Sequence, residues 1–151
     1  MLDDIDRRLL RLMQSDPEMP AAELAERCRV TPATVSRRLD RLGEAGVLKA
    51  QSAVINWPSL GYTVEVSLRF TLDKTNARAF DEFLEQARTV PEVIEIQTFL
   101  GRVDVRLSVI ARDMSHYQQI YRQSILTLPH IADIEALMHV STIKSAEVLP
   151  I

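Results

Sequence analysis

The sequence has little cysteine, no long apolar run and no histidines at metal-ligand spacing. Its single cysteine, Cys28, allows neither an intrachain disulfide nor a thiolate metal cluster, and this fits a reducing compartment. The apolar stretches are short and interrupted by charges, so no segment is expected to cross a bilayer. The three histidines are scattered, so we expect no metal site.

An overall basic charge is also absent, because the formal net charge is −3, and this total by itself argues against a nucleic-acid partner. The charge is unevenly spread: residues 1–50 carry nine basic and nine acidic side chains, whereas residues 51–151 carry nine and twelve. The arginines of the first part cluster around 27–41, so a local basic face can still contact phosphate. Met1 precedes acidic residues rather than a basic, apolar leader, so we expect no signal peptide and a cytoplasmic location.

The first 46 residues have the pattern of three helices. Asp3 is expected to cap the first helix, which ends before Pro17. The second helix is predicted to open with Pro20 at its first position. Thr31 is expected to cap the third helix, and Gly46 is typical of the residue that follows a helix end. Two short helices joined by a tight turn indicate a helix-turn-helix.

The third predicted helix places arginines away from its apolar positions, as a helix in a DNA groove would. A solvated helix face is the alternative, because Asp40 and Glu44 are close enough in sequence to pair with some of these arginines. We expect groove contact from Arg37 and Arg41. We expect phosphate or base-edge contact from Thr31, Thr34, Ser36 and Arg38. The candidate DNA-binding residues are Thr31, Thr34, Ser36, Arg37, Arg38 and Arg41.

The hydrophobic period changes from helical spacing to strict alternation after Gly61, which indicates a strand with one buried face. The predicted strands cover residues 62–72, 93–100, 103–110 and 131–143, and the predicted helices cover 77–87 and 113–128. The order strand, helix, strand, strand, helix, strand is typical of the ferredoxin-like split βαβ arrangement. The fold class is therefore α+β.

This division predicts a helix-turn-helix domain over residues 1–50, a hinge strand or linker over 51–60, and an effector-sensing and oligomerisation domain over 61–151. A lone βαββαβ unit leaves one face of its sheet open. We therefore expect a homodimer in which two sheets meet.

Four motifs resemble the Lrp/AsnC (feast/famine) family of bacterial and archaeal transcription regulators. They are LDDIDRRLL at the start, AELAERCRVTPATVSRRLDRLGEAGVL through the two helices, LGY before the first long strand, and GRVD at 101–104. The resemblance implies a winged-type helix-turn-helix, a hinge strand and a C-terminal ligand-sensing domain. It also implies dimers that commonly assemble into octamers, with amino acids as typical effectors.

In that family the hairpin around residues 101–104 borders the effector pocket. Asp104 could hold the ammonium group of an amino acid, while Arg102 or backbone N–H groups hold its carboxylate. Where the family often has an acidic residue and an aromatic, this sequence has Arg102 and Val103. An ordinary hairpin turn is the alternative. The candidate effector-binding residues are Leu100, Gly101, Arg102, Val103, Asp104, Ser141 and Thr142.

The sequence favours a DNA-binding regulator whose assembly or DNA affinity responds to a small effector, an amino acid by resemblance. One alternative is an architectural DNA-binding protein without an effector. Another is an enzyme similar to the sirohaem decarboxylases, which carry His-rich motifs. The corresponding stretch here, VIEIQTFLGRVDV, has no histidine, and no general acid/base constellation is visible. We therefore expect no catalytic residues and no cofactor, with double-stranded DNA, the effector and further copies of the chain as partners.

Overall fold

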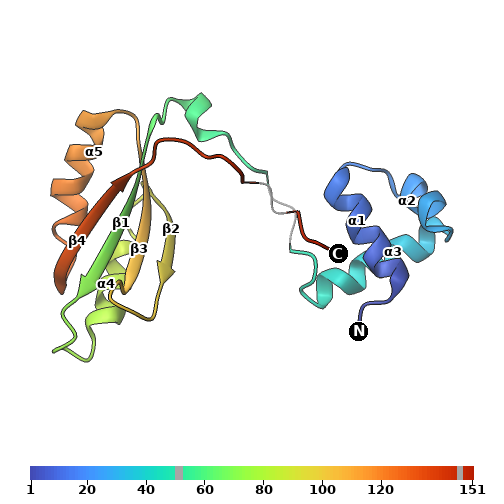
Figure 1. Cartoon of the computed structure of the whole chain (residues 1–151), viewed down its shortest axis with the longest axis horizontal. Helices are drawn as coiled ribbons and strands as arrows, with labels where there is room; N and C mark the ends of the chain where they lie inside the picture. Colours follow the sequence, from blue (N-terminus) through green and yellow to red (C-terminus); the bar gives the residue numbers. More distant parts are fainter. Residues whose placement is uncertain (50–52, 146–147) are drawn as a thin grey trace. The chain divides into compact units, whose positions relative to one another are not determined.

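The computed structural model describes residues 1–49, 53–145 and 148–151, and the chain divides into two compact units. Unit 1 contains Met1–Val54 and Ile143–Ile151, and unit 2 contains Ile55–Thr142 (Figure 1). Over the described residues, none of the helices combines the length and the apolar character needed to cross a membrane. Part of the predicted hinge, residues 50–52, lies outside the described residues.

The described residues of unit 1 form three helices, as the sequence predicts. They are α1 (Asp4–Ser15), α2 (Ala21–Cys28) and α3 (Pro32–Glu44). Leu9, Val35 and Cys28 lie in a shared core in which each is at most 4% exposed. Burial raises the pKa of the Cys28 thiol, so this residue serves as a small core side chain, as predicted.

The helix ends of unit 1 follow the capping residues. Asp3 and Asp6 form a reciprocal capping box at the start of α1, and Thr31 accepts a hydrogen bond from the Thr34 N–H at the start of α3. Pro20 is the N-cap residue of α2 rather than its first helical residue, because its ψ angle of 149° is extended. Arg29 ends α2 in the left-handed conformation, with φ 57°, and so makes the tight turn before α3.

The last described residues also belong to unit 1. The Gln14 side-chain amide donates to the Leu149 carbonyl (3.3 Å) and accepts from the Leu149 N–H, while Arg11 donates to the Ile151 carbonyl. A pocket of about 360 Å³ between this segment and the helices is lined by apolar residues such as Leu10 and Met13. The structure thus groups residues 143–151 with the helical unit, whereas the sequence analysis assigned them to the sensing domain.

Unit 2 has the predicted order of strands and helices. Its elements are β1 (Val64–Leu72), α4 (Ala79–Ala87), β2 (Val93–Thr98), β3 (Val105–Ala111), α5 (Met114–Ile120) with a π-helical continuation (Tyr121–Ile125), and β4 (Ile131–Met138). The sheet order is β2-β3-β1-β4, and every neighbouring pair is antiparallel. This order confirms the predicted ferredoxin-like arrangement.

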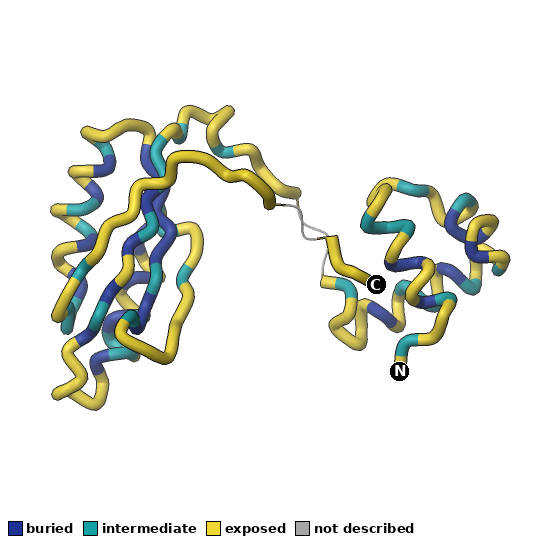
Figure 2. Tube along the Cα trace, in the orientation of Figure 1, coloured by how far each residue is buried: buried dark blue, intermediate teal, exposed yellow. Residues whose placement is uncertain are grey.

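The alternation along β1 separates two faces of the sheet. Val66, Leu68 and Phe70 point toward α4 and α5 and are almost fully buried. The Phe70 ring packs against the tilted ring of Phe83 on α4, with the ring centroids 4.9 Å apart. Arg69 points to the other side, which no helix of unit 2 covers; we call this side the open face. Figure 2 shows the buried residues of the sheet concentrated on the two central strands, β1 and β3, and those of the helices on one side.

Within the predicted hinge strand or linker, the described residues Trp57–Leu60 form a 3-10 helix, and Pro58 cannot donate to a strand ladder. The last strand, β4, ends at Met138 rather than at the predicted residue 143. The His139 N–H still donates to the Glu65 carbonyl (2.9 Å), but Glu65 is only the second residue of β1, so little of β1 remains for β4 to pair with.

Candidate functional site

The outward side of α3 carries Arg37, which is exposed and forms no ion pair within the described part of the chain. Ser36 beside it is also exposed. Val35 and Leu42, at most 1% exposed, fix the inward side of the same helix. This division of faces leaves a guanidinium and a hydroxyl free to contact a partner, as a recognition helix requires.

Two other arginines of α3 are bound to the start of α1. Arg38 donates to Asp3 Oδ2 (2.7 Å) and Asp6 Oδ1 (2.8 Å), and Arg41 donates to both oxygens of Asp6 (3.0 and 2.8 Å). Asp6 is fully buried, whereas the Arg41 side chain is 58% exposed. The Arg41 guanidinium is therefore held by Asp6 and is still accessible to a partner. Arg38, at 18% exposure, mainly joins α1 to α3.

Asp6 is not among the residues predicted from the sequence, where Asp40 and Glu44 of the third helix are the candidate partners of these arginines. One signal could have shown it: Asp6 stands three and four residues before Leu9 and Leu10, and so on the buried side of α1. A buried carboxylate needs a cationic partner, and arginines of α3 supply it.

The ion pairs set the protonation of both carboxyls. Burial would raise the pKa of Asp6, but hydrogen bonds from Arg38 and the Asp3 N–H outweigh it, and the net pKa lies below the ordinary 3.8. The Asp6 N–H and then Arg38 lower the pKa of Asp3 in the same way. Both groups are therefore carboxylates at neutral pH.

Acid should weaken unit 1 through these two carboxyls. Because their folded pKa values lie below 3.8, their stabilisation is fully present above that pH and is lost as the pH falls through the folded values. We expect the difference in unfolding free energy between the wild type and Asp6→Ala to shrink between pH 5 and about pH 2. Urea titrations across this range measure it, and a constant difference would contradict the linkage.

The hydroxyls of Thr31 and Thr34 are engaged with each other, 2.9 Å apart, within the cap of α3. Because both hydroxyls are used in the helix cap, they have less hydrogen-bonding capacity left for DNA. The first-turn N–H groups of α3 and its positive helix end remain suited to a phosphate. Of the six predicted DNA-binding residues, Ser36, Arg37 and Arg41 are the exposed polar ones whose side chains remain available to a partner.

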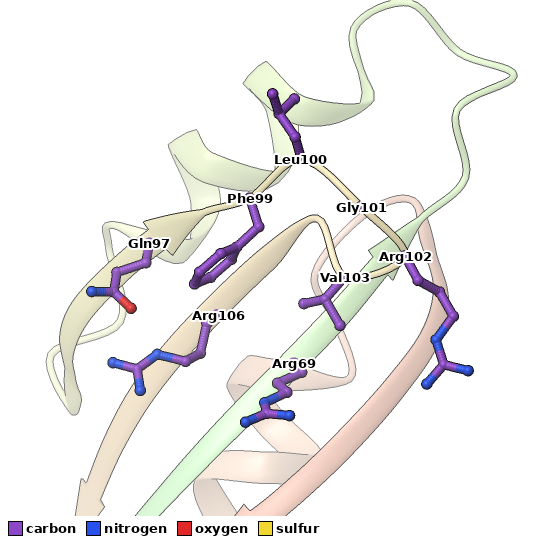
Figure 3. A pocket seen from close by; sticks show the side chains of 8 residues that line it. All are labelled: Arg69, Gln97, Phe99, Leu100, Gly101, Arg102, Val103 and Arg106. Carbon is purple, nitrogen blue, oxygen red and sulfur yellow. The ribbon is translucent and has the colours of Figure 1, made fainter.

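A second candidate site lies beside the loop between β2 and β3. It is a pocket of about 500 Å³ in unit 2 (Figure 3). Four of the predicted effector residues line it: Leu100, Gly101, Arg102 and Val103. Four further lining residues were not predicted, because they come together only through strand pairing: Arg69, Gln97, Phe99 and Arg106.

Asp104 does not line this pocket. It is 3% exposed, and its Oδ2 accepts from the Leu72 N–H (2.8 Å) and pairs with Lys74 Nζ (2.9 Å). The Asp104 N–H also donates to the Phe70 carbonyl (2.8 Å). Its carboxylate thus fastens the end of β1 to the start of β3, and it supports the loop instead of facing the pocket.

Replacing Asp104 with alanine should destabilise unit 2 by about 2 kcal/mol, because the buried Leu72 N–H loses its acceptor. Thermal or urea unfolding of the full chain measures this effect. Asp81→Ala, at an exposed carboxylate of α4, is the matched control and should change stability by less than about 0.5 kcal/mol. Equal effects of the two substitutions would contradict the structural role of Asp104.

Ser141 and Thr142 lie beyond the end of β4, and the structure does not bring them to the loop pocket. Thr142 lines a different pocket of about 410 Å³, together with Trp57 and Tyr62. Its hydroxyl lies 2.9 Å from His139 Nε2. Across the residues that the structure describes, no group of three or more His, Cys, Asp or Glu side chains could hold a metal ion.

Two family models match the chain. The model described as "Lrp/AsnC ligand binding domain" matches residues 65–149, and the one described as "Winged helix-turn-helix DNA-binding" matches residues 2–49. Together they cover both candidate sites.

Two curated relatives are described as transcriptional regulators, and the chain aligns with nearly the whole length of each. The HTH-type transcriptional regulator Zrp of Zymomonas mobilis is 30% identical over 99% of this chain and 97% of its own. The DNA-binding transcriptional activator DecR of Escherichia coli is 27% identical over 100% of this chain and 99% of its own.

Solved structures share the fold. Escherichia coli AsnC aligns with a TM-score of 0.88 at 22% identity, covering 98% of each chain. A transcriptional regulator from Neisseria meningitidis, solved as a complex with L-Met, aligns with a TM-score of 0.87 at 24% identity over 99% of this chain and 97% of its own.

Proposed function

Because the chain belongs to the Lrp/AsnC family of transcriptional regulators, we propose that its α3 reads an operator through Arg37, with Ser36 and Arg41 beside it. The observation that carries this assignment is the guanidinium of Arg37, which is exposed and forms no ion pair among the described residues. The partner is DNA, and the protein is a regulator rather than an enzyme, as its relatives are. Such a regulator acts where the DNA is, in the cytoplasm.

The second part of the proposal is that an amino acid or a close analogue binds the loop pocket of unit 2. The pocket of about 500 Å³ has the size of a small-molecule site. The Neisseria meningitidis regulator of the same fold was solved with L-Met. The effector shifts regulation by binding one assembly or helix spacing better than another.

The third part concerns assembly. The open face of the sheet carries the exposed Leu137 on β4, and a second copy would cover this side chain and the face around it. A two-fold axis would place two recognition helices about 34 Å apart on a near-palindromic operator. We extend this to an octamer of four dimers, as in the family that the chain resembles.

The test is a map of genomic binding with and without candidate amino acids, followed by gel-shift titration of the operator it yields. We expect discrete sites whose occupancy changes with one effector. Discrete sites that respond to no effector would favour an architectural DNA-binding protein instead. An absence of discrete sites would contradict sequence-specific regulation altogether.

A further inference from the structure

The open face of the sheet carries two arginines directly opposite each other. Arg69 of β1 and Arg106 of β3 are cross-strand partners, and Gln97 of β2 is the next partner of Arg106. All three line the loop pocket. Like charges directly opposite on a sheet are destabilising, so this arrangement calls for an anion that offsets their repulsion.

The carboxylates nearby neutralise only one of the pocket's arginines. Glu95 pairs with Arg106 at 3.1 Å, but Arg106 Nε is buried without a hydrogen-bond partner among the described residues. Within the same part of the chain, Arg69 and Arg102 form no ion pair, even though Glu135 is the cross-strand partner of Arg69 on β4.

Of the residues that the structure describes, no carboxylate lines the pocket, so an ammonium group would find no charged partner among its lining side chains. Asp104, which could have supplied one, is held by Lys74 and the Leu72 N–H. In Figure 3 Arg69, Arg106 and the Arg102 loop lie around the side chains of Phe99 and Val103. The pocket is thus cationic at its edges and apolar between them.

We propose that this pocket is selective for a small dicarboxylate, a molecule with two carboxylate groups a few carbons apart. Arg69 and Arg102 bind one carboxylate each, Arg106 with Gln97 supplies further donors, and the short carbon chain lies against Phe99 and Val103. Guanidinium–carboxylate hydrogen bonds are among the strongest in proteins. This inference rests on the proposed function, because it names the chemical class of the effector for the same pocket.

A second copy of the chain is the competing occupant, because the open face is also the surface proposed for dimerisation. Its acidic residues could then neutralise Arg69 and Arg106 in place of a ligand. The two occupants differ in a measurable way: a ligand responds to its concentration at a fixed oligomeric state, whereas a subunit contact changes with the oligomeric state.

The test is calorimetric titration of the full chain with L-glutamate, glutarate, L-leucine and L-methionine. We expect glutarate to bind about tenfold more tightly than either neutral amino acid, which corresponds to one additional charged hydrogen-bonded contact. Binding of glutarate, with or without binding of glutamate, supports the proposal. Binding of glutamate alone would show that the pocket requires the amine and would contradict the proposal.

Arg69→Gln and Arg102→Gln should each weaken dicarboxylate binding about tenfold. Arg122→Gln removes the same charge from an exposed site on the π-helical segment and should leave the affinity unchanged. Equal losses in all three variants would mean that overall charge, rather than the pocket, attracts the anion, and this would overturn the proposal.

Tighter binding of leucine or methionine than of both dicarboxylates would also overturn it, while leaving an effector-responsive regulator intact. If no compound binds and Arg69→Gln changes the sedimentation coefficient, a second copy fills the pocket and the proposal fails. Gel shifts of the wild type with the operator are run in parallel. An absence of specific DNA binding there would contradict the proposed function, whereas specific DNA binding without dicarboxylate binding would contradict only the effector class.

Discussion

Asp6→Ala is expected to lower the free energy of unfolding of the helical unit by about 3 kcal/mol. The substitution leaves Arg38, which is only 18% exposed, without the buried carboxylate that it contacts. Removing one partner of a buried ion pair typically costs about 3–5 kcal/mol. We expect the lower end of this range, because Arg41 is 58% exposed and can be hydrated. Urea unfolding of the full chain, followed by helical circular dichroism, measures the loss.

The matched control is Asp4→Ala, which removes a carboxylate from the first turn of the same helix. Asp4 is exposed and forms no ion pair within the described residues, so its removal should cost less than about 1 kcal/mol. A similar loss for Asp4→Ala and Asp6→Ala would show that the helix dipole, rather than the contacts to α3, accounts for the effect. The double variant Asp6→Ala/Arg38→Met should recover part of the lost stability, because no charge is then left unpaired at that point.

Arg37→Ala is expected to weaken binding to the operator by about tenfold to a hundredfold, the range for one base-edge contact. Arg37 is exposed and unpaired among the described residues, so the free energy of unfolding should stay within about 0.5 kcal/mol of the wild type. Gel-shift titration at fixed salt, on operator and on unrelated DNA, measures both affinities. A loss confined to the operator indicates base contact, whereas equal losses on both indicate phosphate contact.

Arg88→Ala is the control, because Arg88 is exposed at the end of α4 in the other unit and its removal changes the net charge equally. Operator affinity should then remain as in the wild type. Should Arg37→Ala also leave the affinity unchanged with the fold intact, Arg37 does not belong to the DNA-binding site.

Local signals in the sequence were sufficient for the elements of both units. Thr31 and Gly46 mark the beginning and end of the third helix through hydrogen bonding and backbone conformation that involve only near neighbours. The alternation of β1 identified its buried face for the same reason, because each residue's side depends only on its position along the strand.

Contacts between distant segments were beyond such signals. The pairing of Asp6 with Arg38 depends on how α1 crosses α3, and the opposition of Arg69 and Arg106 depends on strand register. Asp104 shows the same limit in another form. It directly precedes Val105, which is fully buried in β3, so alternation would turn Asp104 toward solvent. The strand begins only at Val105, however, and the loop turns the Asp104 carboxylate inward to Leu72.

The docking of Leu149–Ile151 on α1 has an entropic consequence. Unit 1 is made of two stretches of chain separated by the whole of unit 2. Trp57 near the beginning of unit 2 and Thr142 at its end line the same pocket, so the folded unit 2 holds its two ends close together. If unit 2 unfolds, docking the tail means closing a loop of about 90 flexible residues, at a cost of roughly 4 kcal/mol. Attachment of the tail to the DNA-binding helices is therefore thermodynamically linked to the folding of the sensing unit.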